Sequence, residues 1–139
     1  MKVPTLRFTQ WQRWDGRNSL EGNDLPGVYL LAHFSKVQSG RAKRLCGEIV
    51  YIGETCANTL KGRWQQFERS AFKGKGGHSG GWTYRQKIKG KKNILYVAYF
   101  PVDCRLNEEV RPIYIRHIER RLIWDFTRKW GKPPRCNTK

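Results

Sequence analysis

The segments GVYLLAHF (residues 27–34) and IVYIG (residues 49–53) set the framework of this chain. The first is apolar along almost its whole length, which predicts a central β-strand covered on both faces. The second is short, β-branched and aromatic, which predicts another strand. A third apolar run, ILYVAYF at residues 94–100, lies within a strand predicted over residues 93–102.

An amphipathic helix is predicted after the second strand. Leu60, Trp64, Phe67 and Ala71 recur at spacings of four, three and four residues, which places them on one helical face. Asn58 precedes this apolar stripe. Its side-chain oxygen can accept a backbone N–H bond, so Asn58 is the expected N-cap.

A second helix is predicted from residues 111–112, where proline is tolerated in the first turn, to about Trp130. Gly131 and the two prolines at 133–134 end it. The order of elements is therefore β-β-α-β-α. This order predicts a small α+β domain in which helices flank a three-stranded, mainly antiparallel sheet.

The charge of the chain predicts a polyanionic partner. The 139 residues suit one domain, 1–139, and contain 28 Lys and Arg against 11 Asp and Glu, a formal net charge of +17. Such an excess favours nucleic acid or an anionic membrane face. Because 38% of the residues are hydrophobic, the charge belongs to a folded domain and not to a disordered tail.

Several classes of protein are excluded by what the sequence lacks. No apolar run is long enough for a membrane span, so no membrane partner is expected, and residues 1–10 do not form a secretory signal. The cysteines are scattered, without a C-x-x-C pair, which argues against a zinc knuckle and predicts reduced thiols in the cytoplasm. They are Cys46, Cys56, Cys104 and Cys136.

The basic residues concentrate in three places. Residues 73–92 hold six glycines, seven Lys or Arg and no acid, which predicts a flexible positive loop that follows nucleic acid phosphates. Its candidate contact residues are Lys73, Lys75, His78, Trp82, Tyr84, Arg85, Lys87 and Lys89. A second group (Lys36, Arg41, Lys43, Arg44) lies in a predicted loop or hairpin tip over residues 35–48. A third (Arg116, Arg120, Arg121, Arg128) lies on the last helix. Residues 1–26 form a polar N-terminal arm.

Glu119 lies on the apolar stripe of the last helix, together with Ile115 and Leu122. A carboxylate in that position costs free energy unless it is paired or binds a cation. A salt bridge to another element and a metal site at the rim of a cleft both remain open. Arg63, at the edge of the first helical stripe, can either extend into solvent or hold a phosphate.

Tyr29 and Tyr51 lie in the first two predicted strands, where aromatic residues commonly fill the core. Taken with other residues, however, they resemble the GIY-YIG nuclease family. The residues that carry the resemblance are Gly27-Val28-Tyr29, Tyr51-Ile52-Gly53, Arg63, Glu119 and the Pro-x-x-Asn ending at Asn137. The longer segment 35–48 resembles the restriction-enzyme branch.

The chain also departs from the family pattern. Glu54 stands where some members have lysine, and Phe67 where many have histidine or tyrosine. The group that assists proton transfer in those members is therefore absent or supplied from elsewhere. His78 is either that substitute or a mobile loop residue, and the sequence favours the loop residue.

The resemblance implies a divalent-metal-dependent DNA endonuclease. Glu119 would hold one Mg²⁺ or Mn²⁺, and Arg63 would contact the scissile phosphate of double-stranded DNA. Tyr29 would be the general base beside Tyr51, with the reverse assignment open, and Asn137 would orient the site. A homodimer would suit cleavage of a palindrome. The alternative is a non-catalytic nucleic-acid-binding module that retains the fold.

Overall fold

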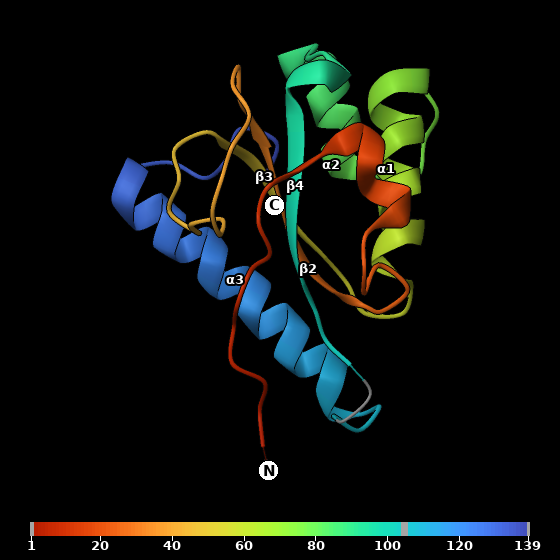
Figure 1. Ribbon diagram of the computed structural model, residues 1–139, viewed down its shortest axis with the longest axis vertical. Helices are drawn as coiled ribbons and strands as arrows, with labels where there is room; N and C mark the ends of the chain where they lie inside the picture. Colours follow the sequence, from red (N-terminus) through yellow and green to blue (C-terminus); the bar gives the residue numbers. More distant parts are fainter. Residues whose placement is uncertain (1, 104–105, 139) are drawn as a thin grey trace.

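The computed structural model describes residues 2–103 and 106–138, which form a four-stranded antiparallel sheet with helices on both faces (Figure 1). The strand order is β1-β4-β2-β3. The bounds are β1 Gln12–Arg13, β2 Gly27–His33, β3 Ile49–Thr55 and β4 Leu95–Pro101. The α+β class is as expected, but the prediction of a three-stranded sheet was wrong. The fourth, β1, is two residues long, too short for a recognisable alternating pattern.

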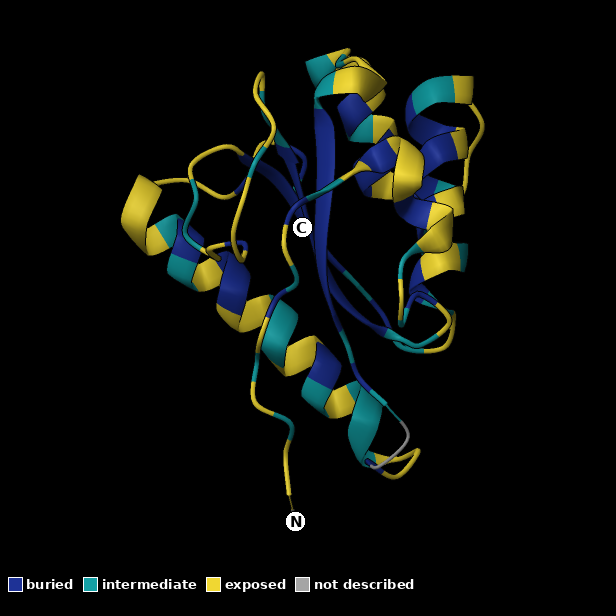
Figure 2. Ribbon diagram, viewed as in Figure 1, coloured by how far each residue is buried: buried dark blue, intermediate teal, exposed yellow. Residues whose placement is uncertain are grey.

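Helices α1 (Leu60–Lys73) and α3 (Val110–Trp130) lie on opposite sides of the sheet. Alternation along β2 explains this arrangement, because successive side chains point to opposite faces. Tyr29 packs with Trp64 of α1, whereas Leu30 packs with Ile115 of α3. Both faces of the sheet are buried (Figure 2). No helix within the described ranges has the length and apolarity needed to cross a bilayer.

The ends of α1 show how local chemistry fixes the helix. Thr59 is the N-cap, because its side chain accepts a hydrogen bond from the Gly62 N–H at 3.0 Å. Asn58, the expected cap, lies one residue earlier and accepts from the Thr59 N–H at 2.8 Å. At the other end, Gly74 adopts the left-handed conformation that commonly ends helices (φ 66°).

The expected flexible loop over residues 73–92 was wrong, because most of this segment is helical. It contains α2 (Ser79–Thr83), the π-helix η2 (Tyr84–Ile88) and the 3-10 helix η3 (Lys92–Ile94). Tyr84 anchors it: the ring is fully buried against Phe67 and Phe72, and its hydroxyl is 2.7 Å from His33 Nε2. The glycines had obscured these contacts at the level of sequence.

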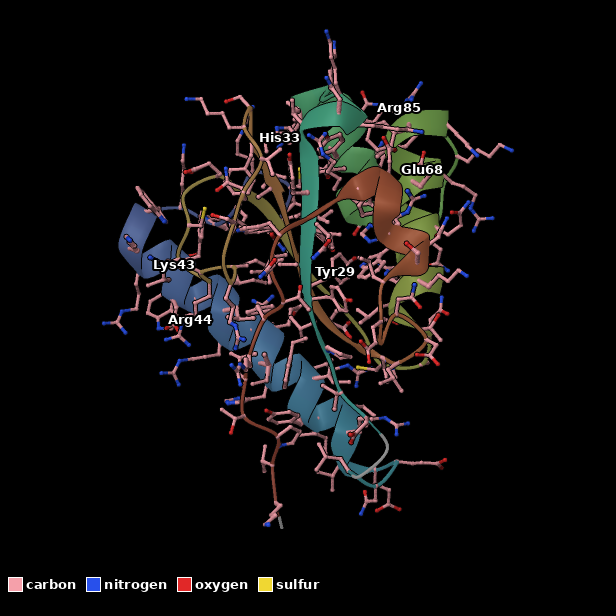
Figure 3. The ribbon with its side chains drawn as sticks, viewed as in Figure 1. Tyr29, His33, Lys43, Arg44, Glu68 and Arg85 are labelled. Carbon is pink, nitrogen blue, oxygen red and sulfur yellow. The ribbon has the colours of Figure 1, made fainter. Side chains whose placement is uncertain are left out.

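A buried carboxylate joins the N-terminal arm to the helical side of the molecule. Glu68 of α1 accepts a hydrogen bond from the indole of Trp14, in the 3-10 helix η1 (Trp14–Ser19), at 2.8 Å. It also pairs with Arg17 at 3.3 Å and Lys92 at 2.6 Å. Glu68 is labelled in Figure 3. These contacts connect η1, α1 and η3 through one side chain.

Three of the cysteines, Cys46, Cys56 and Cys136, are free thiols, as expected. The fourth, Cys104, lies outside the described residues.

Candidate active site

A pocket of about 260 Å³ opens beyond the edge of β3, where α1, α2 and α3 approach one another. Four of the five predicted catalytic residues line it, although they are widely separated in the sequence. They are Tyr51, Arg63, Glu119 and Asn137. Glu54, Ser79 and Arg120 also line the pocket. The pocket therefore combines a phenol, two guanidinium groups and two carboxyl groups.

Tyr29, the fifth predicted residue, lies directly behind the pocket and does not line it. Its side chain is fully buried, and its ring centroid is 6.0 Å from that of Tyr51. Gly53 leaves room for this pair: a Cβ there would lie 2.6 Å from the Tyr29 hydroxyl and 2.5 Å from the Tyr51 ring. Of the two phenols, Tyr51 is the one that faces the pocket.

His78 contacts Tyr29, which the sequence had not favoured. It is only 3% exposed, and its Nε2 lies 2.8 Å from the Tyr29 hydroxyl oxygen. Its Nδ1 accepts a hydrogen bond from the Gly81 N–H at 3.0 Å, so Nδ1 carries no proton. Burial and the charge of Arg63 lower the pKa of His78 to about 3, which keeps the ring neutral. The proton therefore resides on Nε2, and this N–H group donates a hydrogen bond to the Tyr29 hydroxyl oxygen.

Burial has the opposite effect on the two phenols. It raises the pKa of Tyr51 to about 12, while the nearby charge of Arg63 opposes the increase. It also raises the pKa of Tyr29 well above its ordinary value. In both cases desolvation disfavours the phenolate, and positive charge restores part of its stability.

Glu119 and Glu54 face the same pocket from α3 and β3. Burial, and then the negative charge of Glu54, raise the pKa of Glu119 to about 7. Glu119 makes no ion pair or hydrogen bond with any residue in the described ranges. The salt bridge left open by the sequence is therefore not formed there. In the sequence, Glu54 stands out only as a departure from a family pattern. Its alternation along β3 places it on the α3 side of the sheet.

Arg63 and Asn137 are held in place by hydrogen bonds to side-chain and backbone groups. Arg63 Nη1 donates to Gln66 Oε1 at 2.7 Å and to the Gly77 carbonyl at 3.3 Å. The amide of Asn137 accepts from the Ile52 N–H at 2.9 Å and donates to the Ile52 carbonyl at 2.8 Å. Asn137 therefore fixes the C-terminal segment beside Tyr51 and Gly53.

The described residues contain no group of three or more His, Cys, Asp or Glu side chains arranged to hold a metal ion. Glu54 and Glu119 nevertheless offer carboxylate oxygens to one pocket. Mg²⁺ is commonly held by one or two carboxylates, with water and substrate phosphate as further ligands. Because carboxylate oxygen also suits Mn²⁺, the donor set fits either ion.

The expected nucleic-acid contacts divide into two groups. The exposed ones are Lys73, Lys75, Trp82, Arg85, Lys87 and Lys89. His78 and Tyr84 are buried, so their side chains do not reach the surface, contrary to expectation. Both instead belong to the core between α1 and the sheet, because their polar atoms have partners there.

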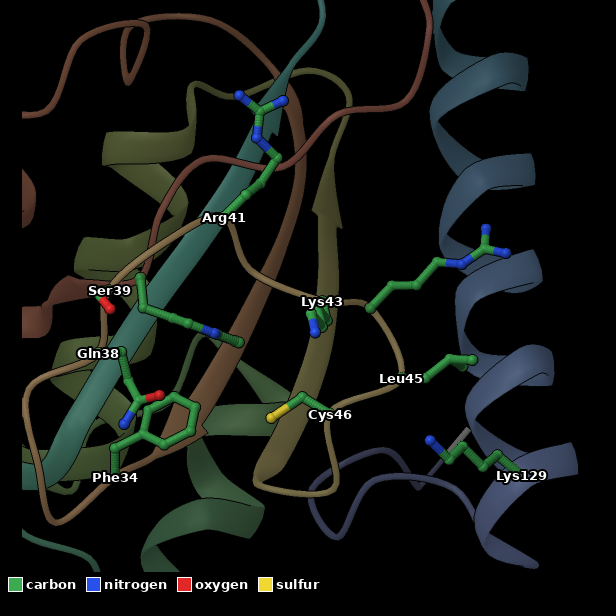
Figure 4. A pocket seen from close by; sticks show the side chains of 10 residues that line it. Phe34, Gln38, Ser39, Arg41, Lys43, Leu45, Cys46 and Lys129 are labelled. Carbon is green, nitrogen blue, oxygen red and sulfur yellow. The ribbon is translucent and has the colours of Figure 1, made fainter.

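A larger cavity, of about 750 Å³, holds none of the predicted catalytic residues (Figure 4). Residues of the loop 35–48, with Trp11, Phe34 and Lys129, line it. Three of its cations, Arg41, Lys43 and Arg44, belong to the second basic group of the sequence. The volume of a cavity therefore does not indicate the candidate active site in this molecule.

The chain matches no protein-family model, no curated protein and no solved structure. The residues of the pocket and the charge around them are consequently the features that bear on its function.

Proposed function

We propose that the protein is a divalent-metal-dependent endonuclease that hydrolyses phosphodiester bonds in double-stranded DNA, related to the GIY-YIG nucleases. One observation carries the proposal: residues 51, 63, 119 and 137 meet in a single pocket. These residues come from a strand, two helices and the C-terminal segment. A molecule that only bound nucleic acid would gain nothing from placing an unpaired glutamate there.

Glu119, with Glu54 beside it, would hold the Mg²⁺ or Mn²⁺ ion. The bound cation would supply charge stabilisation for the phosphate oxygens and favour the phenolate of a neighbouring tyrosine. The two carboxylates and the guanidinium of Arg63 line the same small pocket, so a phosphate group there meets both the cation ligands and a positive side chain.

Tyr51 is the better candidate for the general base, because it lines the pocket and Tyr29 does not. This reverses the sequence-based preference and adopts the alternative that the sequence left open. Tyr51 would accept a proton from the attacking water as the phenolate. Arg63 favours that form and would also bind the negative charge that develops on the phosphate.

Tyr29 and His78 support Tyr51 from behind. The Nε2–H of His78 donates to Tyr29, and the His78 ring packs edge-on against Tyr51, with centroids 5.5 Å apart. This contact limits the orientations open to both phenols. His78 would therefore act as a positioning residue. It lies at the start of α2, whereas many GIY-YIG nucleases have a histidine or tyrosine at the position of Phe67 on α1.

The charge of +17 and the exposed cations of residues 73–92 support DNA as the partner, since they can neutralise phosphates along a duplex. A homodimer and a cytoplasmic location stay predictions.

Plasmid cleavage tests the proposal directly. The wild-type protein should cut plasmid DNA in Mg²⁺ or Mn²⁺, and Glu119→Gln should not. Glu108→Gln is a matched control, since Glu108 is an exposed glutamate just before the same helix. A wild-type protein that binds the plasmid but leaves it intact with both ions would support the non-catalytic binding module instead.

A further inference from the structure

Three tryptophans are substantially exposed, and they differ in what holds them. Trp82, Trp124 and Trp130 are 46%, 58% and 46% exposed. The indole N–H of Trp130 donates to the Leu45 carbonyl at 3.0 Å, and its ring packs near Phe126 and Lys129. Trp124 makes no ring contact and no side-chain hydrogen bond with any residue that the structure describes. Trp82 shares this lack of contacts, but it lines neither the candidate catalytic pocket nor the cleft beside it, whereas Trp124 lines that cleft.

Trp124 borders the candidate catalytic pocket. It lines an adjoining cleft of about 580 Å³ together with Thr127 and Pro133. This cleft and the catalytic pocket share Arg120, Ile123, Asn137 and Thr138, so the two hollows lie side by side. The junction carries an arginine, while the outer part of the cleft is lined by an indole and a proline. The combination suits a group with one charged end and one flat apolar face.

A nucleotide next to the scissile phosphate has that character. We propose that the cleft receives the unpaired base of this nucleotide, stacked on the indole of Trp124. The inference rests on the proposed function for its substrate, and it narrows the substrate class to DNA with an unpaired nucleotide beside the cut.

Two physical arguments favour an unpaired base. Bases stack well on aromatic side chains whatever their sequence. A paired base lies inside the duplex stack and reaches a protein surface only after it is unpaired, which costs free energy. A bulged or otherwise unpaired base avoids most of that cost. Discrimination between paired and unpaired DNA should therefore depend on Trp124.

The test measures binding without cleavage, in the Glu119→Gln background. Two duplexes with the same base pairs are compared. One is fully paired, and the other has one additional, bulged nucleotide, which is 2-aminopurine. We expect the bulged duplex to bind about 10-fold more tightly, with quenched 2-aminopurine fluorescence. Adding Trp124→Ala should remove both effects, and Trp124→Phe should retain most of them. Adding Trp130→Ala is the matched control and should leave both unchanged.

An unchanged preference and unchanged quenching in Trp124→Ala would overturn the inference. So would a change confined to the sedimentation of the variant, since the indole would then cover an interface between two protein chains. Plasmid cleavage by the wild-type protein is scored separately. Cleavage without a Trp124-dependent preference refutes only the base site, whereas the preference without cleavage refutes only the proposed hydrolysis.

Discussion

Glu68 and Glu119 lie on the two long helices, on opposite sides of the sheet, in contrasting environments. Glu68 is 4% exposed and meets Trp14, Arg17 and Lys92. Burial raises its pKa, but the hydrogen bonds from Lys92 and Trp14 and the charge of Arg17 outweigh this, so its pKa is lowered. Glu119 has no such partner in the described chain, and its pKa is raised to about 7.

The contrast separates a structural carboxylate from the one that is proposed to bind a metal ion. Glu68 has its charge compensated within the protein and joins three elements. Glu119 lies beside a second carboxylate, in a pocket that admits a phosphate-sized group. Partners, and not burial alone, distinguish the two roles.

The largest expected effect is on catalysis. Glu119→Gln should reduce the rate of plasmid cleavage by about 10³-fold, because it removes the carboxylate proposed to hold the cation that stabilises the charge on the phosphate. It should leave the free energy of unfolding unchanged or slightly increased, since it also removes repulsion from Glu54. Cleavage kinetics and urea unfolding check the two parts. A Glu119→Gln variant that is both active and unstable would place Glu119 in the same class as Glu68.

Glu68→Gln should have the opposite profile. It leaves Arg17 and Lys92 without their anion and should lower the free energy of unfolding by about 3 kcal/mol, measured by urea denaturation. The folded variant should still cleave DNA at the wild-type rate, because Glu68 does not line the pocket. A large loss of rate in fully folded protein would contradict this separation.

A smaller effect is expected at His78. His78→Ala removes the donor to Tyr29 and should lower kcat about 10-fold, with KM little changed. His78→Gln offers an amide donor and should recover part of the rate. Nitrogen-15 shifts of the wild-type imidazole should place the proton on Nε2. Protonation on Nδ1 would contradict the hydrogen bond from Gly81.

The smallest effect is the acid dependence of stability. Because the pKa of Glu68 is lowered on folding, its contribution is complete above its ordinary pKa of about 4.3. The contribution is lost as the pH falls through the lowered folded value. The stability difference between the wild-type protein and Glu68→Gln should therefore narrow below about pH 4 in urea titrations. A constant difference from pH 7 to pH 3 would show that folding does not change the pKa of Glu68.

The sequence predicted the parts of the fold that follow a regular period. Strands β2, β3 and β4 and helices α1 and α3 each carry an apolar pattern long enough to identify them. β1 is too short for such a pattern, and the glycines of 73–92 concealed the buried anchors His78 and Tyr84.

The sequence indicated a residue of the candidate site when that residue interrupts a regular apolar pattern. Glu119 interrupts the apolar stripe of its helix and was therefore noticed. Glu54 breaks no pattern in a strand, and the partners of Glu68 and His78 come from distant segments. Only tertiary structure brings Trp14 and Lys92 to Glu68, or Tyr29 to His78.

The C-terminal segment lies along the edge strand β3 and forms hydrogen bonds with its backbone. The Cys136 N–H donates to the Val50 carbonyl at 2.9 Å, and the side chain of Asn137 occupies both backbone groups of Ile52. Main-chain groups that could join another molecule's sheet are thereby occupied at this margin. Removing the residues from Cys136 onward should expose these groups and make the protein prone to self-association. The same truncation removes Asn137 from the neighbouring pocket.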